Sequence, residues 1–260
     1  MQVAGRRPLV TGANRGLGVQ FVEELLSRGA DRVYAAARDI DALVPLTSRH
    51  GQRVVPVRLD LTDPGQIREA VDRHPDIDVL VSNAGQTCRV PVLDGHAEAS
   101  FRSVMEVNFF GPLAVVQALA PQLQAHRGGV LFVQSIASLI ASPGSTVYSA
   151  TKAAAMVLAT GVRAELASAG VVVTSTFPGA MDTDMTREFD VPKASPRSVA
   201  ARSIDGLEAG SVNVFPDPLS ELVRDAVLTD MASVLDHPEN VMSHLMAARL
   251  RDARAAGERH

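Results

Sequence analysis

Short apolar runs rich in Val, Leu and Ile alternate along the chain with longer stretches in which apolar residues recur with a helical period. The pattern predicts strands at Pro8–Val10, Arg32–Ala37, Val54–Arg58, Asp78–Ser82, Val130–Gln134, Val171–Phe177 and Val212–Phe215. It predicts helices at Gly16–Arg28, Pro64–Arg73, His96–Met105, Phe110–Gln124, Val147–Ser168 and Ser198–Ala209. Apolar strands that alternate with helices are typical of a parallel sheet buried on both faces. We therefore predict an α/β fold with a doubly wound, seven-stranded parallel sheet in a single domain.

Capping and turn residues support several ends of these elements. Asp63 precedes Pro64, as expected for an N-cap residue followed by proline in the first helical turn. Gly29 and Gly170 stand where two helices would end in a left-handed conformation. These residues therefore favour the helix boundaries that the apolar pattern predicts.

Two segments near the C-terminus differ from this regular alternation. The connection from Gly179 to Pro196 is long, and long loops in compact domains are usually functional. We predict a substrate loop at about residues 180–196 that closes over the ligands. Residues 219–260 predict two further helices, which extend the same domain.

Composition and charge exclude several classes of partner. The formal net charge is −4 and no basic stripe is present, so we expect neither a nucleic acid nor a membrane surface as partner. The longest apolar stretch is interrupted by Pro112 and Pro121, and no signal peptide is evident. Cys88 is the single cysteine, which fits a reducing compartment, and the seven histidines lack metal-ligand spacing. We expect a cytoplasmic protein without a metal.

A glycine-rich turn follows the first predicted strand. It reads Thr11-Gly-Ala-Asn-Arg-Gly-Leu-Gly18 and leads directly into a helix. Glycines at 12, 16 and 18 allow a tight turn and a close approach to a pyrophosphate, which the helix N-terminus attracts. The alternative is a glycine-rich turn without a ligand. We interpret residues 1–218 as a Rossmann-type domain that binds a dinucleotide and carries the catalytic residues.

The end of the second strand indicates which dinucleotide binds. NAD-binding units place an acidic residue there, about 20 residues past the glycines, to bind the ribose 2′-hydroxyl. This chain has Ala37 followed by Arg38, and Arg15 lies in the glycine-rich turn. Two guanidinium groups suit a 2′-phosphate, so we predict NADP(H). Asp39 is more consistent with a cap for the next helix, and a solvated surface arginine is the alternative for Arg38.

Three residues suggest the chemistry. Tyr148 and Lys152 stand four apart in a predicted helix and so project from one face, and Ser135 follows a buried strand. The chain has only two tyrosines, and Lys152 and Lys193 are its only lysines, so this spacing is unusual by chance. Separately, each residue has an ordinary structural explanation.

Together these motifs resemble the short-chain dehydrogenase/reductase family, in its shorter single-domain branch, from Pro8 to about Pro218. The resemblance implies a catalytic tetrad of Asn108, Ser135, Tyr148 and Lys152. It implies cofactor contacts from Gly12, Asn14, Arg15, Gly16, Leu17, Gly18, Arg38, Asp60, Leu61, Asn83, Ala84, Gly85, Tyr148, Lys152, Pro178, Gly179 and Thr183. The implied activity is hydride transfer between NADP(H) and a carbonyl or alcohol.

The residue types fit that chemistry. Tyr148 would give a proton to the carbonyl oxygen, but a free tyrosine has a pKa near ~10. Lys152 and an oxidised nicotinamide would both lower that pKa, and Lys152 would also bind the nicotinamide ribose. Ser135 would orient the carbonyl, and Asn108 would hold a water that relays protons. Gln134 replaces a serine that is common in the family, which should alter only the support behind Ser135.

The substrate, the assembly and the class of function are less defined. Ser135 and Tyr148 with Ile136, Met181 and Met185 would line a largely apolar substrate pocket, to which Phe189 and Cys88 could add; a packed, inert thiol is the alternative for Cys88. Pro216 and Pro218 interrupt the last strand, which the family's tetramers pair across an interface, so we predict a monomer or a dimer through the helices at Phe110 and Val147. Two alternatives to an enzyme stay open: a non-catalytic NADP(H)-sensing regulator, and a partner-binding protein that has kept only the fold.

Overall fold

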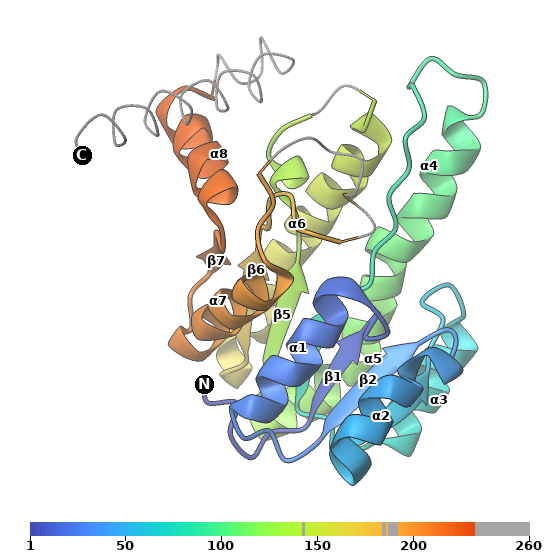
Figure 1. The fold of residues 1–260 in the computed structure, drawn as a ribbon, viewed down its shortest axis with the longest axis vertical. Coiled ribbons are helices and arrows are strands. Elements are labelled where there is room, and N and C mark those ends of the chain that lie inside the picture. Colours follow the sequence, from blue (N-terminus) through green and yellow to red (C-terminus); the bar gives the residue numbers. More distant parts are fainter. Residues whose placement is uncertain (142–143, 184–185, 187–191, 232–260) are drawn as a thin grey trace.

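The computed structural model describes residues 1–141, 144–183, 186 and 192–231. In this part of the chain seven parallel strands form one sheet in the order β3-β2-β1-β4-β5-β6-β7 (Figure 1). The strands are β1 Pro8–Thr11, β2 Val33–Ala37, β3 Val54–Arg58, β4 Val79–Ser82, β5 Gly129–Val133, β6 Val172–Thr176 and β7 Asn213–Val214. The predicted doubly wound α/β fold is confirmed. Because the strand order reverses between β1 and β4, a crevice opens at the carboxyl ends of these strands.

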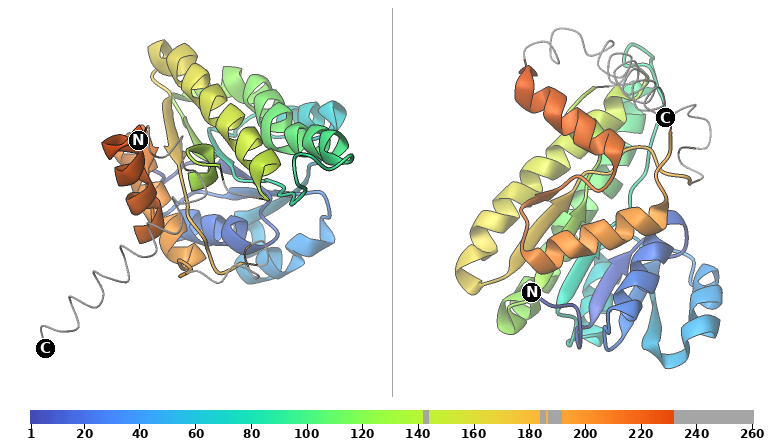
Figure 2. Two further views of the ribbon diagram at one scale, coloured as in Figure 1. Left: turned by 90° about the horizontal axis from the view of Figure 1, so that it is seen from above. Right: turned by 60° about the vertical axis from the view of Figure 1, so that its left-hand side comes forward.

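Helices cover both faces of the sheet, as Figure 2 shows. The helices are α1 Gly16–Ser27, α2 Val44–His50, α3 Pro64–Arg73, α4 Ala97–Met105, α5 Gly111–His126, α6 Thr146–Leu166, α7 Pro196–Ala209 and α8 Pro218–Thr229. One apolar core lies between the sheet and α1, α2 and α7, where Phe21 and Ile204 are fully buried. A second core lies under α3, α5 and α6 around Leu80 and Leu119. The sheet is therefore apolar on both sides, as its strand sequences require.

Capping residues act as the sequence predicts. Asp63 accepts hydrogen bonds from the backbone N–H groups of Gly65 and Gln66 at the start of α3. Gly29 and Gly170 have φ values of +85° and +73°, the left-handed conformation in which glycine ends a helix. Most element boundaries consequently agree with the sequence pattern to within two residues.

The helix α2 is one element that the apolar pattern did not predict. It has seven residues, follows a short 3₁₀ turn at Asp41–Leu43 and begins with a proline in its first turn. A helix this short presents only Leu46 to the core, so no helical period is visible in the sequence. The Asp39 side chain accepts from the backbone N–H of Asp41, but the N-cap residues of the 3₁₀ turn and of α2 are Ile40 and Leu43, so the predicted cap is not formed by Asp39.

The two helices predicted around Met105 and Phe110 form one continuous helix, Ala97–His126. A π-helical turn, η3 Glu106–Phe110, joins α4 to α5 without a break. Neither Pro112 nor Pro121 interrupts it, which corrects the expectation from sequence; by length and composition alone this helix could cross a membrane. Its residues Val115, Leu119 and Leu123 are buried in the second core, a property shared by core helices of soluble proteins.

The C-terminal end differs from the expectation in two respects. The last strand, β7, has only two residues, because Phe215 and Pro216 leave the sheet soon after pairing with β6. Of the two helices predicted beyond Pro218, the first is α8, and the second falls outside the described residues. The predicted monomer or dimer stays a prediction.

Candidate active site

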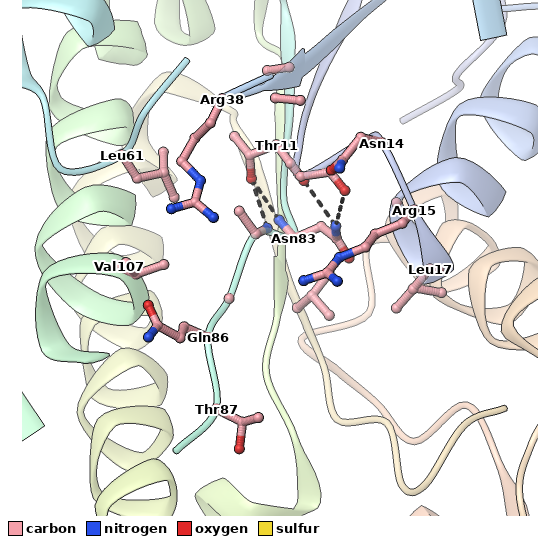
Figure 3. Close-up of a pocket in the computed structure, with 18 of the residues that line it drawn as sticks. Thr11, Asn14, Arg15, Leu17, Arg38, Leu61, Asn83, Gln86, Thr87 and Val107 are labelled. Atoms are coloured by element: carbon pink, nitrogen blue, oxygen red, sulfur yellow. Dashed lines mark hydrogen bonds between the residues drawn. The ribbon is translucent and has the colours of Figure 1, made fainter. Parts of the chain in front are cut away.

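A pocket of about 540 Å³ lies at the carboxyl ends of the strands, where the strand order reverses. Its walls come from the glycine-rich turn after β1, the ends of β2 and β5, the segments after β3 and β4, and helix α6. Figure 3 shows lining residues from the glycine-rich turn and from the segments at the ends of β2, β3 and β4. This is the position at which open parallel sheets bind their ligands.

The glycine-rich turn fits so tightly that side chains are excluded. Gly12 has a φ of +66°, and a Cβ atom on Gly18 would lie 2.0 Å from the carbonyl oxygen of Gly12. The turn therefore brings bare backbone and the N-terminus of α1 to the pocket, which is the arrangement that binds a pyrophosphate. This observation fits the predicted dinucleotide.

Hydrogen bonds tie this turn to the end of β4. The Thr11 hydroxyl accepts from the backbone N–H groups of Asn83 and Ala84, both at 3.0 Å. In return the Asn83 side-chain amide donates to the carbonyl oxygens of Thr11 and Gly12, at 2.9 and 3.3 Å (Figure 3). The two central strands thus hold the turn in place from both sides.

Two guanidinium groups face the pocket. Arg15 comes from the glycine-rich turn and Arg38 from the end of β2, and both side chains project toward the cavity (Figure 3). Neither forms a salt bridge with any of the residues that the structure describes. Asp39 accepts from its own following turn, so it does not neutralise Arg38. The pair can bind an anionic group of a ligand.

Tyr148 and Lys152 lie on the first turns of α6 and line the other end of the pocket. The Lys152 ammonium group donates to the carbonyl oxygen of Val133 at 3.0 Å and lies 6.0 Å from the centre of the Tyr148 ring. Burial lowers the pKa of Lys152 to about 8. Lys152 is therefore partly neutral near physiological pH.

The pKa of Tyr148 departs from the expectation. Burial raises it, and a hydrogen bond with the Ser135 side chain acts in the opposite direction without reversing the shift. Lys152 was expected to lower this pKa, but its ammonium group is directed at the Val133 carbonyl oxygen. In the protein alone Tyr148 is thus protonated at neutral pH, the state in which it can act as an acid.

Asn108 lies in the π-helical turn η3, a feature that is frequent at functional sites. Its side-chain amide donates to the carbonyl oxygen of Gln86 and the hydroxyl of Thr151, both at 2.9 Å, and accepts from the backbone N–H of Gln86 at 2.8 Å. Asn108 therefore connects the segment after β4 to α6. Both amide N–H bonds are already used within the protein.

The pocket brings together most of the predicted cofactor residues: Gly12, Asn14, Arg15, Gly16, Leu17, Gly18, Arg38, Asp60, Leu61, Asn83, Ala84, Gly85, Tyr148, Lys152 and Thr183. Of the predicted substrate residues, Tyr148 and Met181 line it. Met185 and Phe189 lie outside the described residues, as do residues 184, 187–188 and 190–191 of the loop predicted at 180–196, whose closure stays a prediction.

Several predicted residues lie elsewhere. Pro178 and Gly179 are absent from the pocket lining, because the Gly179 N–H donates to Asp217 at the start of α8 and the Pro178 carbonyl accepts from Ile136. Ile136 packs against α8 in a separate apolar cluster, also outside the lining. These three residues therefore lie beside the pocket rather than in its lining, and their predicted cofactor and substrate roles stay predictions.

Ser135 and Asn108 also lie outside the lining of the large pocket, and so does Cys88, a half-buried free thiol. Ser135 contacts the site through Tyr148, and Asn108 contacts it through Gln86 and Thr151. The catalytic roles of the four tetrad residues stay predictions. Among the described residues no cluster of His, Cys, Asp or Glu could hold a metal ion.

Sequence reasoning missed several lining residues: Thr11, Ala36, Ala37, Leu59, Gln86, Thr87, Val107, Val133 and Gln134. Most of them lie in the last residues of a strand or just after it. Because ligands bind at the carboxyl ends of parallel strands, their position beside strand ends could have identified them. Gln134 was noted only for the serine that it replaces, yet it is buried and reaches the pocket. Gln86 and Thr87, in the segment after β4, make the pocket more polar than the largely apolar substrate pocket that was predicted.

Comparisons with known proteins agree with this geometry. The family model described as short chain dehydrogenase matches residues 7–193. The chain is 39% identical to a short chain dehydrogenase from Burkholderia cenocepacia J2315, solved in complex with NADP; the superposition has a TM-score of 0.85 and covers 90% of this chain and 97% of that chain.

Curated relatives extend the similarity to eukaryotes. The oxidoreductase BOA17 of Botryotinia fuckeliana is 35% identical over 72% of this chain and 70% of its own length. The NADPH-dependent 1-acyldihydroxyacetone phosphate reductase of Saccharomyces cerevisiae is 31% identical over 72% of this chain and 65% of its own length. The dehydrogenase/reductase SDR family member 7B of Mus musculus is 30% identical over 96% of this chain and 81% of its own length.

Proposed function

The chain belongs to the short-chain dehydrogenase/reductase family, and from that premise we propose that it is an NADP(H)-dependent oxidoreductase that reduces a carbonyl compound to an alcohol or catalyses the reverse reaction. The observation that carries the proposal is that one pocket is lined both by two guanidinium groups and by the Tyr148–Lys152 pair. One end suits a phosphorylated dinucleotide and the other suits proton transfer to oxygen.

Residues of this chain would hold the cofactor along the pocket. The backbone of the glycine-rich turn and the N-terminus of α1 would bind the pyrophosphate, and Arg15 and Arg38 would bind the 2′-phosphate. Asp60 and Leu61 would meet the adenine end. The structure with NADP from Burkholderia cenocepacia and the NADPH-dependent yeast relative support this choice of cofactor.

The chemistry at the other end requires a proton donor and a charge. NADPH, when bound, supplies the hydride. Tyr148 gives its proton to the carbonyl oxygen as negative charge develops there, a step worth about 10²–10⁴-fold in rate. Lys152 stabilises the phenolate that results, and its remaining N–H groups can bind the nicotinamide ribose. Ser135, which hydrogen-bonds Tyr148, orients the substrate oxygen.

The test is NADPH consumption against a panel of ketones, aldehydes and quinones, with NADH measured at equal concentration. We expect turnover with NADPH on at least one carbonyl class and its loss in Tyr148→Phe, with NADPH binding retained. Tight NADPH binding with no turnover across the panel would favour a regulator that senses the cofactor. Failure to bind either dinucleotide would exclude both functions.

A further inference from the structure

Gln134 has a buried side chain that is only half satisfied. It is 4% exposed and directly follows β5. Its neighbours in the chain are Val133, whose carbonyl oxygen accepts from Lys152, and Ser135. Its amide N–H donates to the carbonyl oxygen of Ala155 on α6 at 3.2 Å. Its oxygen, Oε1, is buried and has no hydrogen-bond partner among the described residues. A buried amide oxygen without a donor is costly, so such an atom calls for an explanation.

A small cavity lies beside the Gln134 side chain. It has a volume of about 10 Å³, and its polar lining residues are Ser82, Asn108, Gln134 and Lys152. This volume is close to the smallest that admits one water molecule, and a water needs two to four polar partners. Gln134 and Lys152 line both this cavity and the large pocket, so the two spaces meet at these side chains.

Among these neighbours, Gln134 has a free acceptor and Lys152 has free donors. The Asn108 amide already donates to Gln86 and Thr151 and accepts from Gln86. Within the part of the chain that the structure describes, Lys152 makes one hydrogen bond, to Val133, and an ammonium group has three donors. A Cβ atom on Gly85, which lines the large pocket, would lie 3.6 Å from Lys152 Nζ and 3.4 Å from Asn108 Oδ1, so this glycine packs beside both side chains.

We propose that Gln134 is a positioning residue whose Oε1 accepts a hydrogen bond from a water molecule that in turn accepts from Lys152 Nζ. The function proposed above is needed for the role of Lys152 in the reaction, but the water site does not depend on it. Such a water partly restores the hydration that Lys152 loses on burial and so stabilises its charged form. Gln134 thereby sets the pH at which Lys152 titrates.

Few other charges can account for that titration. Tyr148 is the titratable group that faces Lys152 from α6, while β5, the segment after β4 and the turn η3 present Val133, Gly85 and Asn108, which do not titrate. Arg15, Arg38 and Asp60 are the other charged residues in the described lining of the large pocket, and they come from its cofactor end. Burial is the one cause that lowers the pKa of Lys152.

The experiment measures the Lys152 pKa directly. Because Lys152 and Lys193 are the only lysines, protein labelled with ¹³C at the lysine ε-carbon gives two NMR signals, which Lys193→Arg assigns. Gln134→Met keeps the side-chain length but removes the acceptor, and we expect it to lower the Lys152 pKa by about one unit. Gln134→Glu adds a negative charge at the same place, and we expect it to raise that pKa by at least as much.

Gln122→Met is the matched control. Gln122 lies on α5 outside both cavities, donates to the Val71 carbonyl oxygen and also has a buried amide oxygen without a described partner. We expect it to leave the Lys152 titration unchanged. An unaltered Lys152 pKa in Gln134→Met, or shifts of one sign in both Gln134 variants, would overturn the proposal.

If Gln134→Met does not fold, Gln134→Leu, which also lacks the acceptor, takes its place, and an unaltered Lys152 pKa in that variant would equally overturn the proposal. The outcome is independent of catalysis, since no substrate is used. A protein that showed the Gln134 effect without any carbonyl reduction would retain this inference and lose the proposed function.

Discussion

The two ends of the pocket are built in different ways. At the cofactor end, backbone and exposed cations line the pocket. The Thr11 hydroxyl accepts from the backbone N–H of Asn83, and the Asn83 side-chain amide donates to the carbonyl oxygen of Thr11. At the catalytic end, Tyr148, Lys152 and Gln134 bring ionisable or polar side chains close to the core, where burial shifts pKa values and leaves an acceptor unpaired. The cations of the first end are exposed to solvent, whereas Lys152 and Gln134 at the second end are buried.

Because of this difference, we expect mutations at the two ends of the pocket to have different effects. A charge exchanged at the exposed end changes which ligand binds, because water and salt weaken its effect on the fold. A group exchanged at the buried end changes proton energetics, because a buried site amplifies electrostatic interactions. The predictions below compare the two ends, from the largest expected effect to the smallest.

Removal of the Tyr148 hydroxyl should have the largest effect. We expect Tyr148→Phe to lower kcat by at least about 10²-fold, the loss of a general acid, while the NADPH dissociation constant changes less than about 3-fold. Steady-state kinetics and NADPH fluorescence titration measure the two quantities. Near-normal turnover in this variant would remove Tyr148 from the mechanism and the buried end from catalysis.

The exposed cations should decide the choice of cofactor. With each charge-assisted hydrogen bond halved by exposure and salt, two arginines favour NADPH by about 2–3 kcal/mol, or about 30- to 150-fold in kcat/KM. Ala37→Asp combined with Arg38→Ala should reverse the preference, because a carboxylate accepts from a ribose 2′-hydroxyl and repels a phosphate. The variant should unfold at nearly the wild-type temperature.

Arg49→Ala is a matched control for that experiment, since Arg49 is an exposed cation paired with Glu23 outside the pocket. It should leave the preference unaltered. Equal use of NADH and NADPH by the wild-type protein at near-physiological salt would contradict the placement of both arginines at the 2′-phosphate.

The buried ammonium group should set the pH dependence of reduction. Lys152 has a pKa of about 8, below its usual value, so its charged form predominates below that pH and is lost as the pH rises through it. We expect kcat/KM for NADPH, which reports the free enzyme, to fall about tenfold for each pH unit above this value. A kcat/KM for NADPH that did not change between pH 7 and about 10 would show that the charge of Lys152 is not needed for the reaction.

A buried change at the cofactor end should affect stability more than chemistry. Thr11→Val removes the acceptor for two backbone N–H groups, those of Asn83 and Ala84, and should lower the free energy of unfolding by about 2 kcal/mol. We expect kcat to change less than about 3-fold, because Tyr148 and Lys152 keep their surroundings. Urea unfolding gives the first quantity, and a kcat as low as that of Tyr148→Phe would show that the two ends are not independent.

Local patterns in the sequence were sufficient for the fold and for the cofactor end. The apolar alternation located the strands, and the glycine-rich turn with Arg15 and Arg38 located the residues that face the cofactor. Such features are visible because they depend on neighbours in the chain: a strand on alternation, a turn on glycine, a cap on Asp63. Helix α2 was not predicted, because its seven residues are too few to display a helical period.

The catalytic end depended on contacts between distant segments. The spacing of Tyr148 and Lys152 placed them on one helical face, but only the packing of α6 on β5 set the pKa of each. Gly179 was expected at the cofactor, and only the tertiary structure shows that its N–H also donates to Asp217, the N-cap of α8, 38 residues along the chain. Gln134 looked like a neutral replacement of a serine until its burial against Lys152 and Ala155 was visible. Sequence by itself thus determined the family, the sheet and the chemical groups present, and tertiary structure decided which of those groups are buried, paired or left with a free hydrogen-bonding atom, because burial is a property of the whole packed chain.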